Sequence, residues 1–171
     1  MWSAIKHSLN NTLGTFKDTP LDKIVSGKSY EAFYDMAKFI HLTSGSDDGS
    51  ILFIPKSIQS LNGNPYADNE DIKTIIFPYG FREIKANDFS GCVHLENIFL
   101  PDSLTNIRAH AFDFCTNLKT IYIPSSVSII NSPAFSNCDN LTDIYIDRPS
   151  SNPIAGGAPW GATNATIHYK T

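Results

Sequence analysis

Hydrophobic residues recur at a constant interval between positions 52 and 169. Isoleucine occupies positions 75, 98, 121 and 144, and successive numbers in this series differ by 23. The same interval relates further classes of residue: Pro55, Pro78, Pro101 and Pro124; Phe89, Phe112 and Phe135; Cys92, Cys115 and Cys138; Leu95, Leu118 and Leu141. So many classes of position in one phase predict a repeat solenoid, in which each unit buries its apolar edge against the next.

Each repeat is expected to begin with a short strand. In Ile121-Tyr122-Ile123 the isoleucines point inward and the tyrosine points outward, as alternation along a strand requires. Proline then ends the pairing because it has no N–H to donate. Stacked units form a parallel sheet of about six strands, which begin near Leu52, Ile75, Ile98, Ile121, Ile144 and Ile167. The rest of each repeat turns the chain back across a thin core, with a tight helical or 3₁₀ turn that directs Phe135 and Cys138 inward.

Both ends of the repeat region depart from the pattern. The first unit has Tyr66 where later units have phenylalanine and Asn69 where they have cysteine, and terminal repeats are expected to be atypical. Towards the other end, a loop rich in proline, glycine and serine spans residues 148–161, yet Ile167 still follows Ile144 at the interval of the repeat. We therefore predict a sixth, closing strand, with Trp160 folded over the open end of the core as a lid.

Residues 1–48 carry no repeat and form a separate N-terminal segment, whereas residues 49–171 hold the repeats. Capping residues and apolar spacing predict helices that begin near Ser3, Thr19 and Ser29. The last of these would place Phe33, Tyr34 and Ala37 on one face. One hypothesis makes the segment a small helical cap over the open end of the first repeat. The other makes it an anchor on a larger assembly, because its opening residues resemble those of some phage-encoded and prophage-encoded proteins.

The run from Leu118 to Val127 reads Leu-Lys-Thr-Ile-Tyr-Ile-Pro-Ser-Ser-Val, and Ile130, Phe135, Cys138 and Leu141 continue it. This pattern resembles the BspA-like class of leucine-rich repeats over roughly residues 52 to 169. The resemblance implies a leucine-rich-repeat solenoid that acts as a non-catalytic interaction or adhesion module. Members of the class are mostly bacterial and protistan proteins that are secreted or displayed on the cell surface, so the resemblance implies that location as well.

The middle residue of each predicted strand points away from the core, onto the outer face of the sheet. Down the ladder these positions form an apolar and aromatic series, here called the outer stripe: Phe53, Ile76, Phe99, Tyr122, Tyr145 and His168. Charged residues border it at Lys73, Glu96 and Lys119. An exposed stripe of this kind suits a protein or glycan partner. The same side chains also stabilise a ladder by about 0.2–1 kcal/mol per cross-strand pair, so a purely structural role stays open.

The three cysteines share one phase of the repeat, so they are expected to be buried core residues with protonated thiols. His94 and His110 lie near two of them, but neither histidine recurs in the third full repeat, and a zinc site needs clustered ligands. The sequence has no nucleophile elbow, glycine-rich phosphate loop or paired metal-binding histidines. We therefore expect a non-enzymatic protein without catalytic residues, metal or cofactor.

Charge and hydropathy narrow the partners further. The net charge of −4 and the scattered lysines and arginines argue against nucleic acid and against an anionic membrane surface. No apolar run approaches the roughly 18 residues that span a bilayer, and the first residues lack the uninterrupted apolar core of a secretory signal. The protein acts where it is made, leaves by lysis or another route, or carries a signal outside this sequence.

Two functions stand as hypotheses. The first is an interaction and adhesion module that presents the outer stripe to a protein or glycan on a cell or host surface. The second is a structural or receptor-binding component of a phage-type particle, anchored by residues 1–48. A surface or secreted location rests on the family resemblance, and a phage particle or the cytoplasm are the alternatives. The sequence predicts no oligomeric state.

Overall fold

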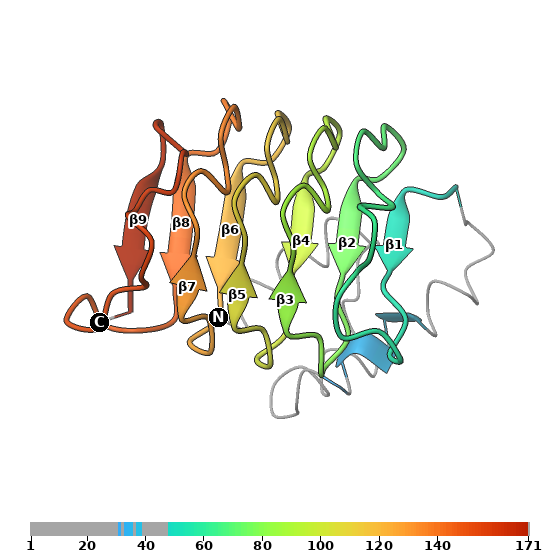
Figure 1. The fold of residues 1–171 in the computed structure, drawn as a ribbon, viewed down its shortest axis with the longest axis horizontal. Coiled ribbons are helices and arrows are strands. Elements are labelled where there is room, and N and C mark those ends of the chain that lie inside the picture. Colours follow the sequence, from blue (N-terminus) through green and yellow to red (C-terminus); the bar gives the residue numbers. More distant parts are fainter. Residues whose placement is uncertain (1–30, 32, 36, 39–47, 171) are drawn as a thin grey trace, which may run out of the picture.

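The computed structural model describes residues 31, 33–35, 37–38 and 48–170. The repeats coil into a solenoid in which short strands lie side by side in chain order (Figure 1). The first row of strands consists of β1 (Ile51–Phe53), β2 (Thr74–Ile76), β4 (Asn97–Phe99), β6 (Thr120–Ile123), β8 (Asp143–Ile146) and β9 (Thr166–Tyr169). The predicted solenoid and its six parallel strands are confirmed.

The strand register follows the sequence repeat. Leu52 lies opposite Ile75, which in turn lies opposite Ile98. Further along, Ile144 is the partner of both Ile121 and Ile167. The strands form two ladders, β1-β2-β4 and β6-β8-β9, and β4 lies next to β6 in Figure 1. The closing strand β9 therefore keeps the phase of the repeat across the preceding loop, as predicted.

A second row of strands was missing from the prediction. β3 (Glu83–Ile84), β5 (Asn106–Ile107) and β7 (Ile129–Ile130) form a parallel ladder of their own, and their arrows run opposite to those of the first row in Figure 1. Ala155, in the loop before β9, adds a bridge to Ile129 at the β7 edge. Each of these repeats thus contributes two strands on opposite sides of the core, and the expectation of a single sheet was incomplete.

Side chains of equal phase stack between the two rows. The rings of Phe89, Phe112 and Phe135 are buried, with centroids 5.7 and 5.6 Å apart and interplanar angles of 10° and 3°. The three cysteines are buried and unpaired, as expected. Each thiol donates to a carbonyl oxygen of the preceding repeat, for example Cys115 Sγ to Phe89 O at 3.3 Å. Burial raises the pKa of Cys92 to about 11, so that thiol is protonated at neutral pH.

The turns that precede the first-row strands also repeat, and one phase of the repeat keeps the left-handed conformation in each of them. Asp68, Gly91, Phe114, Asn137 and Trp160 share one phase of the repeat and have φ angles of 58°, 77°, 57°, 56° and 52°. At Gly91 no side chain fits, because a Cβ atom there would lie 2.1 Å from an oxygen of Asp68. Trp160 is completely buried within the core cluster, so its predicted packing against the core is confirmed.

Residues 31, 33–35 and 37–38 are helical, and Phe33, Tyr34 and Ala37 are buried together as their spacing predicts. The helices predicted near Ser3 and Thr19 lie outside the described residues. The helical residues were expected to cover the open end of the first repeat. They pack instead on the outer face of the first ladder, where they contact β1 and β4.

Candidate functional site

Part of the outer stripe is covered by the chain's own helical segment. The ring of Phe33 lies 5.7 Å from that of Phe99, and the ring of Tyr34 meets Phe53 edge-on at 5.8 Å. The Tyr34 hydroxyl donates a 2.5 Å hydrogen bond to the carbonyl oxygen of Ile54. Burial, with a smaller effect of Asp35, raises the pKa of Tyr34. This segment therefore packs on the outer face of β1 and β4.

The expectation that the whole stripe is exposed is wrong at Ile76 and Phe99. These residues are 0% and 4% exposed, and the Phe33 ring packs against Phe99 at this point. Phe53, at the edge strand, is half-buried. We call Phe53, Ile76 and Phe99 the covered half of the stripe.

Ion pairs connect the helical segment to Lys56, just after β1, at the C-terminal edge of the covered half. The ammonium group of Lys56 lies 2.7 Å from a carboxylate oxygen of Asp35 and 3.6 Å from Glu31, both on the helical segment. The same group lies 5.8 Å from the centroid of the Tyr34 ring. The pKa of Lys56 is raised, chiefly by its hydrogen bond to Asp35. A positive charge on this border thus matches two negative charges on the segment that covers it.

The other half of the stripe, here called the open half, consists of Tyr122, Tyr145 and His168. Their rings form a continuous stack, with centroids 4.9 and 4.5 Å apart and interplanar angles of 13° and 16°. Tyr145 is 37% exposed, and the two outer members of the stack are half-buried. Here the structure brings three predicted site residues together on β6, β8 and β9.

Asp143 fixes the end of this stack. Its carboxylate accepts a 2.8 Å hydrogen bond from Nε2 of His168, and its second oxygen accepts one from the Thr142 hydroxyl at 2.7 Å. These hydrogen bonds, the one from Thr142 foremost, lower the pKa of Asp143. Because a carboxylate only accepts, the Nε2 atom of His168 carries the proton. The imidazole is therefore held parallel to the Tyr145 ring.

The stacking decides which part of each ring a partner can touch. The ring faces of Tyr122 and Tyr145 lie against each other and that of His168 against Tyr145, at distances close to the spacing of neighbouring strands. The ring edges and the tyrosine hydroxyls consequently point away from the sheet. In the middle of the stack both faces of the Tyr145 ring are therefore occupied by its neighbours.

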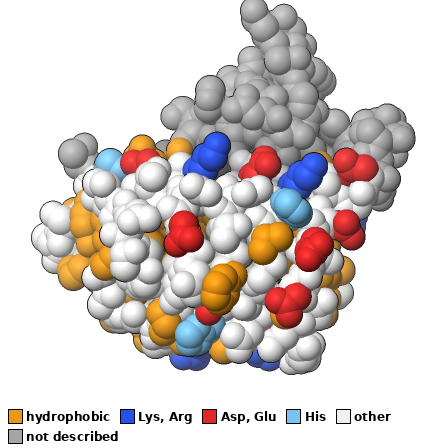
Figure 2. Space-filling view, turned by 90° about the horizontal axis from the view of Figure 1, so that it is seen from above, with side chains coloured by type: hydrophobic (Ala, Val, Ile, Leu, Met, Phe, Trp, Pro, Cys, Tyr) orange, Lys and Arg blue, Asp and Glu red, His pale blue; other side chains and the backbone are white. Residues whose placement is uncertain are grey.

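The predicted polar border is present. Lys73, Glu96 and Lys119 are all exposed, one in each of three successive repeats just before the strand. Basic and acidic side chains alternate along one edge of the molecule in the view from above (Figure 2). This border therefore presents charges of both signs.

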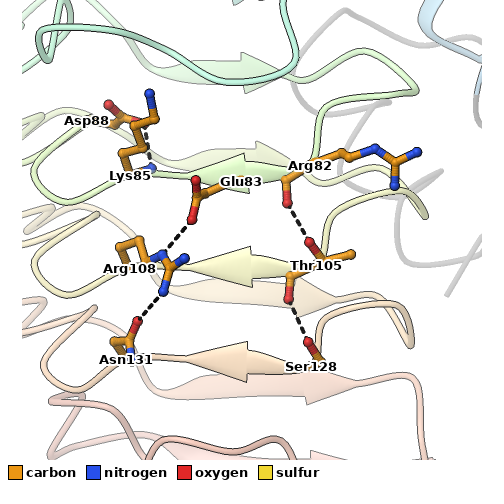
Figure 3. Close-up of polar contacts among 8 residues, drawn as sticks. All are labelled: Arg82, Glu83, Lys85, Asp88, Thr105, Arg108, Ser128 and Asn131. Carbon is orange, nitrogen blue, oxygen red and sulfur yellow. Dashed lines mark hydrogen bonds and ion pairs between the residues drawn. The ribbon is translucent and has the colours of Figure 1, made fainter.

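The second row of strands carries a different surface. Arg108 bridges Glu83, at 2.5 Å, and Asn131, at 3.5 Å (Figure 3). Beside this cluster the Thr105 hydroxyl donates to the carbonyl oxygen of Arg82, and the Ser128 hydroxyl donates to that of Thr105. The polar groups on this side largely form hydrogen bonds with one another between successive repeats. We therefore interpret them as structural.

Two exposed aromatic residues escaped the sequence interpretation, Tyr79 at 54% and Phe114 at 50% exposure. Both lie in turns, where no alternation of inward and outward positions reveals them. Within the described residues, no group of three or more histidine, cysteine, aspartate or glutamate side chains is arranged to hold a metal ion. No helix among those residues is long and apolar enough to cross a membrane.

A family model described as the BspA type leucine rich repeat region matches residues 45–153 in 6 copies. The chain belongs to this family. Leucine-rich-repeat proteins are generally protein-interaction modules, and their solenoid is typical of non-enzymatic scaffolds. Among curated protein sequences, none matches this chain.

Solved structures of bacterial repeat proteins share the fold. A leucine rich cell surface protein from Faecalibacterium prausnitzii is 20% identical, with a TM-score of 0.60 over 71% of this chain and 32% of its own. The pneumococcal vaccine antigen PcpA is 23% identical, with a TM-score of 0.58 over 71% of this chain and 31% of its own. A leucine rich repeat protein from T. pallidum is 22% identical, with a TM-score of 0.53 over 71% and 70%. The chain thus spans about a third of the first two proteins, and at these identities the likeness concerns the fold alone.

Proposed function

We propose that the chain is a non-catalytic interaction and adhesion module that binds a protein on a cell or host surface through the open half of the outer stripe. The observation that carries the proposal is the stack of Tyr122, Tyr145 and His168, which lies on the same sheet whose other half is already occupied by a helical segment. Lys119 and Asp143 border this half with opposite charges. Aromatic side chains with a polar rim are the composition of protein-binding patches.

A protein partner is favoured over a glycan because the stacked rings present their edges. A location on the cell surface or in the secreted fraction accords with the family and with the printed descriptions of two structural neighbours, a cell surface protein and a vaccine antigen. The solenoid supports a non-catalytic role, since its inward positions are filled by core side chains. Residues 1–48 would then be a segment that covers part of the sheet, with residues 49–171 as the binding module.

The proposal is tested by removing the stack. The full chain is first applied to an array of purified extracellular-matrix proteins and glycans, and the affinity of each hit is measured by equilibrium titration. The double substitution Tyr122→Ala with Tyr145→Ala is expected to weaken binding of the protein hits at least tenfold. It removes two stacked pairs, so unfolding free energy should fall by only about 0.5–2 kcal/mol.

Phe114→Asn is the matched control, because it removes an exposed aromatic ring from a turn and not from a first-row strand. It should leave the affinity within a factor of two. If the double variant binds as tightly as the parent chain while its melting temperature falls by many degrees, the stack is structural and the proposal is wrong. Hits confined to glycans would contradict the choice of a protein partner.

A further inference from the structure

The outer edge of β9 is open in the part of the chain that the structure describes. β9 pairs with β8 alone among the described strands, and it is the last arrow of the first row (Figure 1). The amide of Thr166 donates to the carbonyl oxygen of Thr142 at 2.8 Å, and the amide of Lys170 donates to β8 as well. Because alternate residues of a strand direct their backbone groups to opposite edges, the N–H and C=O groups of Ile167 and Tyr169 point away from β8.

The inward side chains of β9 lack the cover that those of β8 receive. Ile144 and Ile146 on β8 are 0% and 2% exposed, and β9 lies beside them. Ile167 and Tyr169 have the same phase on β9 but are only half-buried, because no described strand follows. A strand added to this edge would therefore pair free backbone groups and bury apolar side chains at the same time.

The rest of this end of the solenoid is closed. Ile154, Trp160 and Ala162 are 5%, 0% and 2% exposed and complete the core of the last turn. In the second row, Ala155 already bridges to the edge of β7. Little open core remains on which a whole further repeat could stack, and the opening is confined to one strand edge. This arrangement favours an added strand over end-to-end stacking of two solenoids.

The sequence of β9 is complementary to itself in the antiparallel direction. When two copies of β9 pair about His168, Ile167 of each copy lies opposite Tyr169 of the other. These two pairs exchange N–H···O=C bonds and join β-branched to aromatic side chains, which is a favourable cross-strand combination. Thr166 of each copy lies opposite Lys170 of the other, so no like charges meet along the strands. The contact has twofold symmetry and is closed.

We propose that two copies of the chain form a symmetric dimer by antiparallel pairing of their β9 strands about His168. Residues that lie opposite each other share a face of the sheet, so the two His168 side chains meet on the outer face. The stack of Tyr122, Tyr145 and His168 then continues into the stack of the second copy, and the two open halves form one surface. The inference goes beyond the proposed function and does not depend on it, because the contact is made by the edge of β9.

Analytical ultracentrifugation of the full chain tests for the dimer. The chain is measured from about 5 μM to about 500 μM, because an interface of small area associates weakly. We expect an equilibrium between monomer and dimer without larger species. A chain that stays monomeric throughout this range overturns the proposal. An open-ended series of oligomers also overturns it, because head-to-tail contacts produce such a series.

Thr166→Lys tests the register of the paired strands. It places a lysine opposite Lys170 of the other copy at both ends of the pairing, and the dissociation constant of the dimer should rise about three- to tenfold. The rise should shrink at high salt, because screening weakens exposed charge pairs. Within its own chain the new lysine lies beside Asp143, the β8 partner of Thr166, so the fold should keep its stability.

Ser57→Lys is the matched control for this substitution. It adds the same charge in an exposed turn after β1, at the opposite end of the row of strands. It should leave the dissociation constant unchanged. A dimer that is indifferent to Thr166→Lys, or that responds equally to Ser57→Lys, overturns the antiparallel pairing about His168.

Amide hydrogen exchange of the full chain reports on the backbone pairing. The amides of Ile167 and Tyr169 should exchange rapidly at low concentration and become protected as the dimer forms. The amide of His168 faces β8, so its protection should not depend on concentration. If the chain sediments as a dimer while Ile167 and Tyr169 exchange equally fast at both concentrations, the dimer uses another surface and the inference is wrong. The proposed function is unaffected by that result, because its test is the binding loss on substitution of Tyr122 and Tyr145.

Discussion

Asp88 occupies a position that holds alanine in the next two repeats, Ala111 and Ala134. The reason lies in the backbone N–H group three residues earlier in each repeat, which needs a hydrogen-bond acceptor. Arg108 N–H donates to the carbonyl oxygen of Ile84, and Asn131 N–H donates to that of Ile107. The corresponding donor in the second repeat, Lys85 N–H, donates instead to the Asp88 side chain at 2.7 Å (Figure 3). Asp88 thus supplies an acceptor that the degenerate first repeat does not provide.

This arrangement makes stability depend on pH. Asp88 is fully buried, and its second oxygen has no hydrogen-bond partner among the described residues. Burial raises the pKa of Asp88 to about 6, so between the unfolded-state pKa near 4 and pH 6 the folded protein binds the proton more tightly than the unfolded chain. The stabilisation is complete below about pH 4 and is lost as the pH rises through about 6, a change of up to about 3 kcal/mol.

Asp88→Asn is therefore predicted to flatten the pH dependence of stability. The amide oxygen still accepts from Lys85 N–H, but the side chain no longer ionises. Urea unfolding from pH 4 to pH 8 should show the parent chain losing stability relative to the variant as the pH rises. Asp139→Asn, at an exposed carboxylate, serves as the control. A constant difference between the parent and Asp88→Asn across this range would mean that Asp88 does not titrate on folding.

Phe114 is strained in its turn. Its φ angle of 57° lies in the left-handed region, which costs a bulky L-residue about 1–2 kcal/mol, and its ring is half-exposed. The same turn position in other repeats holds Asp68, Gly91 and Asn137, which tolerate this conformation better. Phe114→Asn should therefore raise the unfolding free energy by about 0.5–1 kcal/mol in urea titrations.

Tyr79→Asn is the comparison for this prediction, because Tyr79 is similarly exposed but does not have a positive φ angle. Its substitution should change stability by less than about 0.5 kcal/mol. If Phe114→Asn destabilises the chain, the ring contributes packing that outweighs the backbone strain.

At the scale of the elements, the sequence period predicted the first row of strands and their register because identical positions must stack. The second row was missed for a physical reason. β3, β5 and β7 are two residues long, and each contributes a single inward isoleucine, such as Ile107 on β5. Such short strands show no alternation. Their existence follows from the parallel stacking of the repeats and not from any local pattern.

The exposure of the stripe could be predicted only in part. Alternation in Ile121-Tyr122-Ile123 correctly placed Tyr122 on the outer face, and the same rule placed Ile76 and Phe99 there. What it could not supply was the packing partner. Phe33 meets Phe99 across a long stretch of sequence, and nothing in the period of the repeats encodes a contact with a segment that does not repeat.

Removal of that partner should uncover the buried half of the stripe. We predict that Phe33→Ala with Tyr34→Ala releases the helical segment, because the substitutions delete both aromatic contacts and the hydrogen bond to Ile54. The newly exposed Ile76 and Phe99 should increase the fluorescence of the dye ANS, while far-ultraviolet circular dichroism retains the strand signal of the repeats.

Lys56→Ala is the control for the helical segment, since its ion pairs are solvent-exposed and such pairs contribute only about 0–1 kcal/mol. It should leave ANS fluorescence unchanged. Equal ANS binding by the parent chain and the doubly substituted variant would contradict the packing of this segment on β1 and β4.

At the scale of the whole molecule, the repeats form the core. The loop that holds Trp160 and the helical segment, which do not follow the repeat pattern, pack against it. Trp160 is buried in the core near the C-terminal end of the repeats. It has the same left-handed backbone conformation as the residues at its position in earlier repeats, such as Asn137. The helical segment covers half of the outer face. The stack of Tyr122, Tyr145 and His168 is the portion of the stripe that combines aromatic rings, hydrogen-bonding groups and solvent exposure, and it is there that we place the partner.

The most direct test of that placement is an aromatic ¹H–¹³C NMR titration of the full chain with a protein ligand obtained from the matrix array. The ring resonances of Tyr122, Tyr145 and His168 should shift or broaden as the complex forms. Those of the exposed turn residues Tyr79 and Phe114 should stay in place. Shifts confined to Tyr79 or Phe114, with the stack unaffected, would show that the partner binds the turns and would contradict the account.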